Sequence, residues 1–190
     1  MILRQRTYDI DDLWERSHRD VMDPKHYELI DGALIVMSPP GGRHGQLAVR
    51  LGHYLVAFAD ALGLGVVTAE TGYHAPDSRQ TVLSPDVAFV SRARAPEPFP
   101  DKYVPLMPDL AIEILSPSNT YRQARRKARI CLQNGAQLVW IVMPGRESVE
   151  ICRLAAGGGM TRETVAANES LSGEDVLPGF ELALHRLFAP

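Results

Sequence analysis

The sequence predicts an α/β domain with a mixed central sheet flanked by helices. Two observations carry this prediction. Two long stretches have apolar residues at helical spacing, and short apolar runs typical of buried strands lie between and after them. The chain has 190 residues, of which 45% are hydrophobic and 23% charged, so it is long enough to bury one core. We therefore expect a single domain over residues 1–190.

The N-terminal third predicts a helix, a hairpin and a second helix. Residues 7–26 have helical spacing, and two short strand-like runs, 27–30 and 33–37, follow them. Asp31-Gly32 lies between those runs and is typical of a two-residue hairpin turn. From Arg43 to Leu62 the apolar residues again recur at helical spacing, and the glycines that follow are expected to end this helix.

The middle of the chain predicts the strands of the central sheet. These apolar runs cover residues 66–69, 82–90, 109–115 and 138–142. A helix is expected over residues 118–134, with Ser118 or Asn119 as its N-cap. Residues after 148 alternate in the manner of strands and predict a strand-rich C-terminal tail.

Composition and charge exclude several classes of protein. No apolar run is long enough to cross a membrane, and the N-terminus lacks the apolar segment of a signal peptide, so we expect a cytoplasmic protein with no membrane partner. The formal net charge is −3, which gives no overall basic field for nucleic acid. Any nucleic-acid contact is therefore expected to be local.

One acidic residue stands out in the strand expected over 109–115. From Leu110 to Leu115 every residue is apolar except Glu113. A buried, unpaired carboxylate would cost several kcal/mol. Glu113 therefore requires a metal ion, a cationic partner or a proton.

Other acids occupy positions that would let them join Glu113. Asp86 interrupts an apolar strand in the same way, and Asp109 shares a strand face with Glu113. Glu28 lies in the first hairpin strand, and Glu70 ends the strand before Asp86. Two or three converging carboxylates would bind Mg²⁺ or Mn²⁺. An arginine partner or a turn cap accounts better for any single acid, whereas Asp86 and Glu113 together favour the metal interpretation.

The helix expected over 118–134 contributes a cation. Its arginines lie opposite the apolar stripe of the helix, where a solvated face is the simplest interpretation; they are Arg122, Arg125, Arg126 and Arg129. Lys127 instead lies on the flank of the apolar stripe. Its long stem could carry the ammonium inward, to pair with Glu113 or to stabilise charge on a phosphate, or outward to water, and spacing alone favours neither.

Several of these motifs together resemble a known family. They comprise Glu28-Leu29-Ile30-Asp31-Gly32, His44, Pro85-Asp86-Val87-Ala88-Phe89-Val90, Ile112-Glu113-Ile114-Leu115-Ser116-Pro117-Ser118, Lys127, Asn134-Gly135-Ala136 and Val139-Trp140-Ile141-Val142. In this order they resemble the restriction-endonuclease-like family of the PD-(D/E)XK nuclease superfamily. The resemblance covers about residues 8–155. It implies a restriction-endonuclease-like core of helix, three strands, helix and strand, here about residues 43–143, and a metal-dependent phosphodiesterase site.

The resemblance also implies roles for individual residues. Asp86 corresponds to the aspartate of the PD motif and Glu113 to the acid of the (D/E)XK motif, and both would bind the metal together with the carbonyl of Ile114. The superfamily lysine would fall at Leu115, so the resemblance points to Lys127 as its replacement.

Two further residues match family positions. Glu28 matches an acid of the first hairpin and would complete the catalytic set. His44 matches a histidine at the start of the long helix, where it would support a ligand or contact substrate; a lone histidine near a helix start is more often only a surface or capping residue.

The expected function is that of an Mg²⁺-dependent endonuclease, with Mn²⁺ as an alternative ion and DNA as the expected substrate. A homodimer would suit duplex cleavage. The rival hypothesis is a catalytically inactive nucleic-acid-binding or assembly protein that retains the nuclease fold. The apolar Leu115 and the acidic net charge favour that rival slightly.

Overall fold

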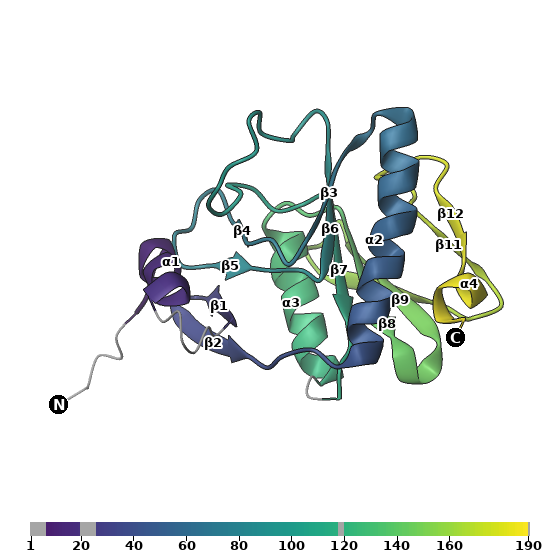
Figure 1. Ribbon diagram of the computed structural model, residues 1–190, viewed down its shortest axis with the longest axis horizontal. Coiled ribbons are helices and arrows are strands. Elements are labelled where there is room, and N and C mark those ends of the chain that lie inside the picture. Colours follow the sequence, from purple (N-terminus) through teal and green to yellow (C-terminus); the bar gives the residue numbers. More distant parts are fainter. Residues whose placement is uncertain (1–6, 20–25, 118–119, 190) are drawn as a thin grey trace.

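A six-stranded mixed sheet forms the centre of the protein, in a computed structural model that describes residues 7–19, 26–117 and 120–189 (Figure 1). Its strand order is β10-β9-β8-β7-β6-β3, and β7 and β8 are its one parallel pair of neighbours within the described residues. A smaller sheet has the order β2-β1-β5-β4, and β11 pairs with β12. The predicted α/β class with a mixed central sheet is confirmed.

Between the two long helices, three strands belong to the central sheet, as the resemblance implied, and two further strands belong to the small sheet. Along the chain the helices and strands are α1 (Ile10–Arg19), β1 (His26–Ile30), β2 (Ala33–Met37), α2 (Gly42–Leu62), β3 (Gly65–Ala69), β4 (Tyr73–His74), β5 (Val82–Leu83), β6 (Val87–Ser91), β7 (Leu110–Ile114), α3 (Tyr121–Gln133), β8 (Leu138–Met143), the 3₁₀ turn η1 (Pro144–Arg146), β9 (Ser148–Leu154), β10 (Met160–Val165), β11 (Ser170–Ser172), β12 (Glu181–Ala183) and α4 (Leu184–Phe188).

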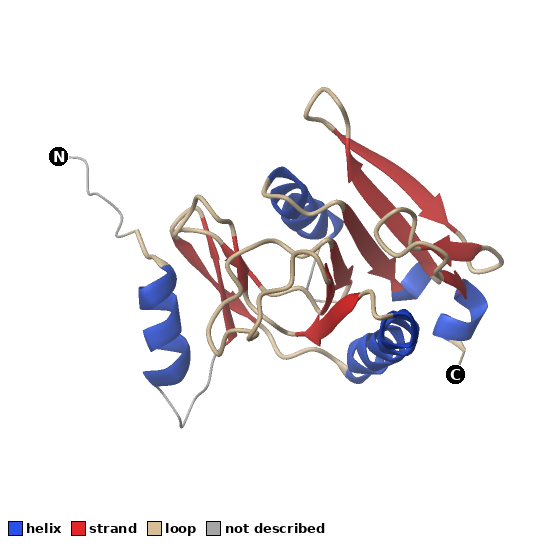
Figure 2. Cartoon of the chain, turned by 90° about the horizontal axis from the view of Figure 1, so that it is seen from above, coloured by secondary structure: helices blue, strands red, loops and turns tan. Residues whose placement is uncertain are grey.

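The two faces of the central sheet are covered by different elements (Figures 1 and 2). On one face, α2 and the C-terminal segment pack over residues such as Leu110, Ile112 and Trp140. On the other face, α3 packs over Ala111 and Val139. Because side chains alternate along β7, Glu113 shares the α3 side with Ala111. Strand parity therefore turns the acidic side chain toward the helix that carries Lys127.

The hairpin of β1 and β2 forms one side of the small sheet. Asp31 and Gly32 both adopt positive φ angles, 52° and 77°, as the turn required. The strands pair from His26↔Met37 to Ile30↔Ala33, and β1 also pairs with β5 through Leu29↔Val82. The small sheet thus places β1 next to the segment that leads into β6.

One predicted strand is wrong in its extent. Residues 82–90 form two strands, β5 and β6, which belong to different sheets. The interruption covers Ser84, Pro85 and Asp86. Pro85 has no amide hydrogen for a ladder, which favours a break at this point. Asp86 therefore lies in the joint between the two sheets rather than inside a strand.

The start of α3 also differs from the prediction. Ser118 and Asn119 lie outside the described residues, and Thr120 is the N-cap. Its hydroxyl accepts a hydrogen bond from the Gln123 amide while the Gln123 side chain accepts one from the Thr120 amide. The helix end at Gln133, before Asn134-Gly135, agrees with the prediction.

The C-terminal tail is rich in strands, as predicted, and two of them extend the central sheet. Strand β9 pairs with β8, and β10 pairs with β9 at the edge. The short helix α4 follows β12 and packs against α2. Among the described helices, none is long and apolar enough to cross a membrane.

Candidate active site

The break before β6 places Asp86 beside the end of β7. Pairing between β6 and β7 stops at Val87↔Ile112, so Ile114 extends past the end of β6. The Ile114 amide donates a hydrogen bond to Asp86 Oδ2 over 2.5 Å. This contact fixes the aspartate next to the residue that follows Glu113. The two acids that the sequence singled out therefore lie at adjacent strand ends.

Glu113 is buried and faces a lysine. The residue is 6% exposed, and its Oε2 lies 2.6 Å from the ammonium of Lys127. Lys127 is on the second turn of α3, and its stem runs inward rather than out to water. The other carboxylate oxygen, Oε1, is buried and has no hydrogen-bond partner among the described residues. Glu113 thus has one oxygen paired with the ammonium and one buried oxygen that could still accept a hydrogen bond or bind a metal ion.

Glu28 joins the same cluster from β1. It is 2% exposed, and its Oε1 lies 2.9 Å from Lys127 Nζ. The same oxygen accepts a hydrogen bond from the Ser84 amide over 3.0 Å. One ammonium therefore stands between two buried carboxylates that come from different sheets.

His44 supports Asp86 from the start of α2. Its Nε2 lies 3.1 Å from Asp86 Oδ2, and the residue is 8% exposed. Its Nδ1 is buried, and no hydrogen-bond partner for it is found in the part of the chain that the structure describes. The helix α2 begins at Gly42, so His44 lies in its first turn and reaches the strand ends from the face opposite α3.

Asp109 lies at the opposite end of β7 and belongs to a separate cluster. Its carboxylate accepts hydrogen bonds from the Arg94 guanidinium over 2.7 Å, the Ser91 amide over 2.7 Å and the Gln137 side chain over 2.5 Å. Burial would raise the pKa of Asp109, but the hydrogen bonds from Ser91 and Arg94 hold it below its ordinary value. These contacts are those of a structural ion pair.

Burial and charge set the protonation of the central pair. Burial raises the pKa of Glu113 to about 8; the Lys127 ammonium opposes this rise, and the charges of Asp86 and Glu28 add to it. Burial would lower the pKa of Lys127, but Glu113 and Glu28 raise it above its ordinary value. Lys127 therefore keeps its charge, and Glu113 holds a proton over part of the neutral range.

Two flanking groups respond to the same charges. The hydrogen bond to Asp86 raises the pKa of His44 above its ordinary value, although burial opposes this. Burial raises the pKa of Glu70, and the charge of Asp86 adds to the rise. Glu70 follows β3 with a positive φ of 51° and lines the same cavity as Asp86. Excess negative charge is thus concentrated around Asp86 and Glu113.

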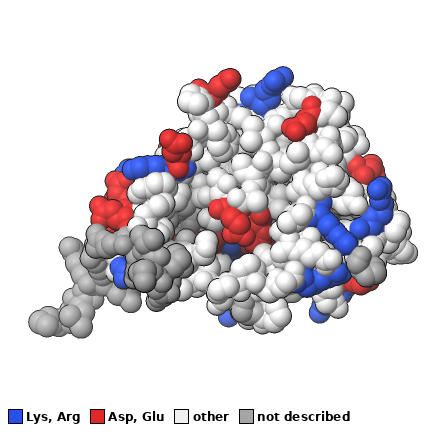
Figure 3. All heavy atoms as spheres, viewed as in Figure 1, with Lys and Arg blue, Asp and Glu red and all other residues white. Residues whose placement is uncertain are grey.

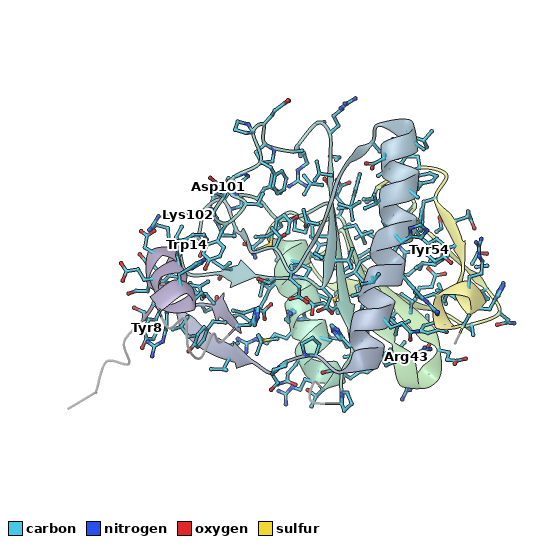
Figure 4. All side chains as sticks on the ribbon, in the orientation of Figure 1. Tyr8, Trp14, Arg43, Tyr54, Asp101 and Lys102 are labelled. Atoms are coloured by element: carbon cyan, nitrogen blue, oxygen red, sulfur yellow. The ribbon has the colours of Figure 1, made fainter. Side chains whose placement is uncertain are left out.

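Two cavities open on the Lys127–Glu113 pair from its two sides. The first, of about 280 Å³, is lined by His44, Glu70 and Asp86, and also by Glu28, Glu113 and Lys127. The second, of about 230 Å³, lies between β2 and α3 and shares those last three residues. Figure 3 shows acidic side chains gathered near the middle of one face, and several basic ones at the lower right, the side where Figure 4 labels Arg43.

The residues present fit a divalent metal ion of the Mg²⁺ type. Asp86 and Glu113 offer carboxylate oxygens, and the Oε1 of Glu113 is a buried acceptor that has no donor within residues 7–19, 26–117 and 120–189. Among the described residues, no three His, Cys, Asp or Glu side chains converge closely enough to hold an ion alone. Mg²⁺ commonly binds through one or two carboxylates and completes its shell with water and phosphate oxygens. Two acids at adjacent strand ends suit that requirement.

Some lining residues were not predicted from the sequence. The amide of Ser84 and the β2 end at Met37 and Ser38 face the site. Strand periodicity carries no information about which residues of a different sheet lie nearby. The loop after β2 is rich in proline and glycine, and its composition predicts a loop without indicating that it lies at the site.

A mixed sheet flanked by α2 and α3, with two acids at adjacent strand ends and a lysine between carboxylates, defines the restriction-endonuclease-like class of nuclease folds. The chain belongs to the Uma2 family, whose description is "Putative restriction endonuclease" and whose profile matches residues 14–185. This confirms the family resemblance drawn from the motifs.

A solved structure has the same fold. It is described as a "putative nuclease belonging to DUF820" from Anabaena variabilis ATCC 29413. The TM-score is 0.79 at 18% sequence identity, over 95% of this chain and 97% of that one. At this identity the likeness establishes the fold and assigns no residue a role. No curated protein matches the chain.

Proposed function

We propose that this protein is a divalent-metal-dependent endonuclease that hydrolyses phosphodiester bonds of DNA. Asp86, Glu113 and the carbonyl of Ile114 would hold the ion, Mg²⁺ or Mn²⁺. Lys127 and Glu28 complete the catalytic set, and His44 positions Asp86. Family membership supports the nuclease class, whereas the ion, the substrate and the residue roles are parts of the proposal.

One observation carries the proposal: the hydrogen bond from the Ile114 amide to Asp86 Oδ2. It brings the two acids to one point of the sheet, although 26 residues separate them in the sequence. A structural role for Glu113 alone would need only Lys127, and it would not account for the unpaired Oε1. The excess of carboxylates over cations at this point favours a bound divalent cation.

When bound, a divalent cation at this point would polarise a phosphate oxygen and lower the pKa of a water molecule. The chain's own residues then have distinct tasks. Lys127 provides a fixed positive charge for the negative charge that develops on the phosphate. Glu28 holds that ammonium in position, and the Ser84 amide orients Glu28 by donating a hydrogen bond to it. His44 keeps Asp86 oriented through its Nε2.

The position of Lys127 accounts for the apolar residue at 115. In the superfamily pattern the lysine follows the acid on the same strand, where this chain has Leu115. Here the ammonium reaches Glu113 from α3, 14 residues later in the chain. A lysine ammonium therefore lies beside Glu113 as in the superfamily pattern, although this lysine belongs to α3 and not to β7. This favours an active enzyme over an inactive relative of the same fold.

We also propose one domain and a homodimeric assembly for duplex cleavage. The two hydrophobic clusters on the central sheet extend from α2 to the C-terminal α4, which supports a single folding unit. One site can cut one strand at a time, so two copies would cut both strands of a duplex together. Sedimentation of the protein with and without duplex DNA would test the second point.

The experiment compares cleavage of supercoiled and linear DNA in Mg²⁺ or Mn²⁺ by the wild type, Asp86→Ala and Glu113→Ala. We expect both variants to lose cleavage and to lose heat of metal binding in calorimetry. Asp77→Ala, at an exposed turn, is the control and keeps both. Equal cleavage by all four proteins would mean that a contaminant or another site cuts the DNA.

A different result would favour the rival function. If the wild type cuts neither DNA nor RNA and takes up no metal, the protein is a non-catalytic member that retains the fold. If it cuts RNA but not DNA, the site assignment stands and the substrate changes. These outcomes separate the class of reaction from the identity of the nucleic acid.

A further inference from the structure

The cavity between β2 and α3 differs in chemistry from the acidic cavity beside Asp86. Its walls are mainly apolar, with Ile30 and Ile35 from the hairpin, Leu115 after β7 and Ala124 from α3. Its charged lining consists of the buried Glu28 and Glu113, the mostly buried Lys127 and the largely exposed Arg126. At about 230 Å³ it is smaller than the roughly 300–1,000 Å³ typical of pockets for drug-sized ligands. A single flat ring system suits its size.

The position of this cavity relates it to the reaction. Glu113, Lys127 and Glu28 line both this cavity and the acidic cavity. A phosphate held at Asp86 and Glu113 would therefore have the apolar cavity next to it, because Glu113 and Lys127 line both cavities. In a nucleic-acid strand, each phosphate is bonded to sugars, and each sugar carries a base. The neighbouring nucleotide is thus the group that can reach this cavity.

We propose that the β2–α3 cavity binds one unstacked nucleobase of the substrate strand, next to the phosphate that is cut. This rests on the proposed nuclease function and adds a substrate class: nucleic acid with an unpaired nucleotide at the cut, either in a single strand or at a flap or mismatch of a duplex. A base inside a duplex is stacked on both faces and cannot enter a pocket without leaving the helix. Single strands, flaps and mismatched positions meet that requirement at lower cost.

The charge of the protein agrees with this mode of binding. Contacts to duplex backbone depend on lysines and arginines that replace counterions. The formal net charge here is −3, and acidic residues surround the site. Affinity must then come in larger part from contacts to bases, and an apolar wall supplies them without reading sequence. The β2–α3 cavity provides such a wall.

The test measures binding without cleavage, in EDTA. The probes are a fluorescent single-stranded thymidine oligomer, an abasic oligomer of the same length and charge, and the duplex of the thymidine oligomer. We expect the thymidine strand to bind about tenfold more tightly than the abasic strand. The duplex should bind less tightly than the single strand.

A pocket-filling variant locates the effect. Ile35 is half-buried and lines the cavity, so Ile35→Trp should fill it and remove the preference for thymidine over abasic strand. Val49→Trp places the same side chain on an exposed position of α2, away from both cavities, and should keep the preference. Thermal unfolding of each variant confirms that it is folded before binding is measured.

Two results would overturn the proposal. Equal binding of the thymidine and abasic strands by the wild type would mean that no base is held. A preference that survives Ile35→Trp, in a folded variant, would place the base elsewhere. Neither result touches the nuclease proposal, which fails only if the wild type does not cut nucleic acid with metal present.

Discussion

Lys127 Nζ lies 2.6 Å from Glu113 Oε2 and 2.9 Å from Glu28 Oε1, so one ammonium pairs with two buried acidic side chains. Replacing it with methionine keeps the stem and removes the charge. Lys127→Met should then lower the free energy of unfolding by about 3 kcal/mol, since breaking a buried ion pair leaves uncompensated charge. Urea unfolding monitored by circular dichroism measures this change.

The control for that variant is on the same helix. Arg129→Met removes a charge from an exposed position and should change the free energy of unfolding by less than about 0.5 kcal/mol. The double variant Lys127→Met/Glu113→Gln should recover part of the loss, because one of the two orphaned carboxylates is gone. No recovery would show that Lys127 acts through packing rather than charge.

Glu113→Gln should leave the metal-free protein as stable as the wild type at neutral pH, or more stable. The pKa of Glu113 is raised from 4.5 to about 8, so the folded state binds its proton more tightly than the unfolded state. That contribution is complete below about 4.5 and is lost as pH rises through about 8. The wild type should therefore lose stability over this window, and Glu113→Gln should show a flatter profile in thermal unfolding.

A large loss of stability in Glu113→Gln at every pH would contradict this prediction. It would mark Glu113 as the necessary partner of Lys127, with Glu28 unable to hold the ammonium alone. Glu181→Gln, at an exposed position of β12, is the matched change and should alter neither the midpoint nor the pH profile.

Metal affinity should rise with pH. A proton on Glu113 blocks a metal ligand, and a charged His44 beside Asp86 repels a cation. The pKa of His44 is raised above its ordinary value by the hydrogen bond to Asp86, and burial raises that of Glu113 to about 8, so both groups lose their protons as pH rises. Calorimetric titration with Mg²⁺ should give tighter binding at higher pH and show proton release in buffers of different ionisation enthalpy.

His44→Gln separates the two contributions. Glutamine can still donate a hydrogen bond to Asp86 but does not titrate, so the pH dependence of metal affinity should become shallower. His53→Gln, on the exposed side of the same helix, should leave it unchanged. A wild-type affinity that does not change with pH would mean that neither proton is linked to metal binding.

Asp109→Ala should damage stability and spare metal binding. Its carboxylate is 0% exposed and holds Arg94, Ser91 and Gln137. Removing it leaves these donors without an acceptor, at a cost of about 2–4 kcal/mol in the free energy of unfolding. Because the pKa of Asp109 is lowered, its contribution is present at neutral pH and is lost as pH falls through its folded value.

Calorimetry distinguishes Asp109 from Asp86. Folded Asp109→Ala should bind Mg²⁺ as the wild type does, whereas Asp86→Ala should not. Both aspartates follow a proline and precede an apolar strand, so the sequence context alone does not tell them apart. The reverse result would move the proposed site to the other end of β7.

Local patterns predicted most of the fold and part of the site. The Asp31-Gly32 turn, the helix over Arg43–Leu62 and the apolar strand around Glu113 each follow from short-range preferences. The break at Pro85 was missed because apolar residues stand on both sides of it, although a proline inside a run is itself a warning.

Long-range partners were beyond the reach of spacing. Helical phase put Lys127 on the flank of the apolar stripe, but it left open whether the ammonium turned inward or to water. The pairing with Glu28 depends on how the small sheet meets the central one. The arrangement of the two sheets depends on packing between segments far apart in the chain, and it produces no periodic pattern of residues in the sequence.

The capping box at Thr120 has a consequence for how this site tolerates change. It fixes the residue at which α3 starts. The number of residues from that start to Lys127 then determines the direction around the helix axis in which the Lys127 side chain points, which is toward β7. An inserted residue between the cap and Lys127 would turn that side chain by about 100° around the helix axis. One inserted before Thr120 would only lengthen the connection from β7. The alignment of the ammonium is therefore a matter of helical phase, and the connection from β7 is the place where chain length can vary without losing it.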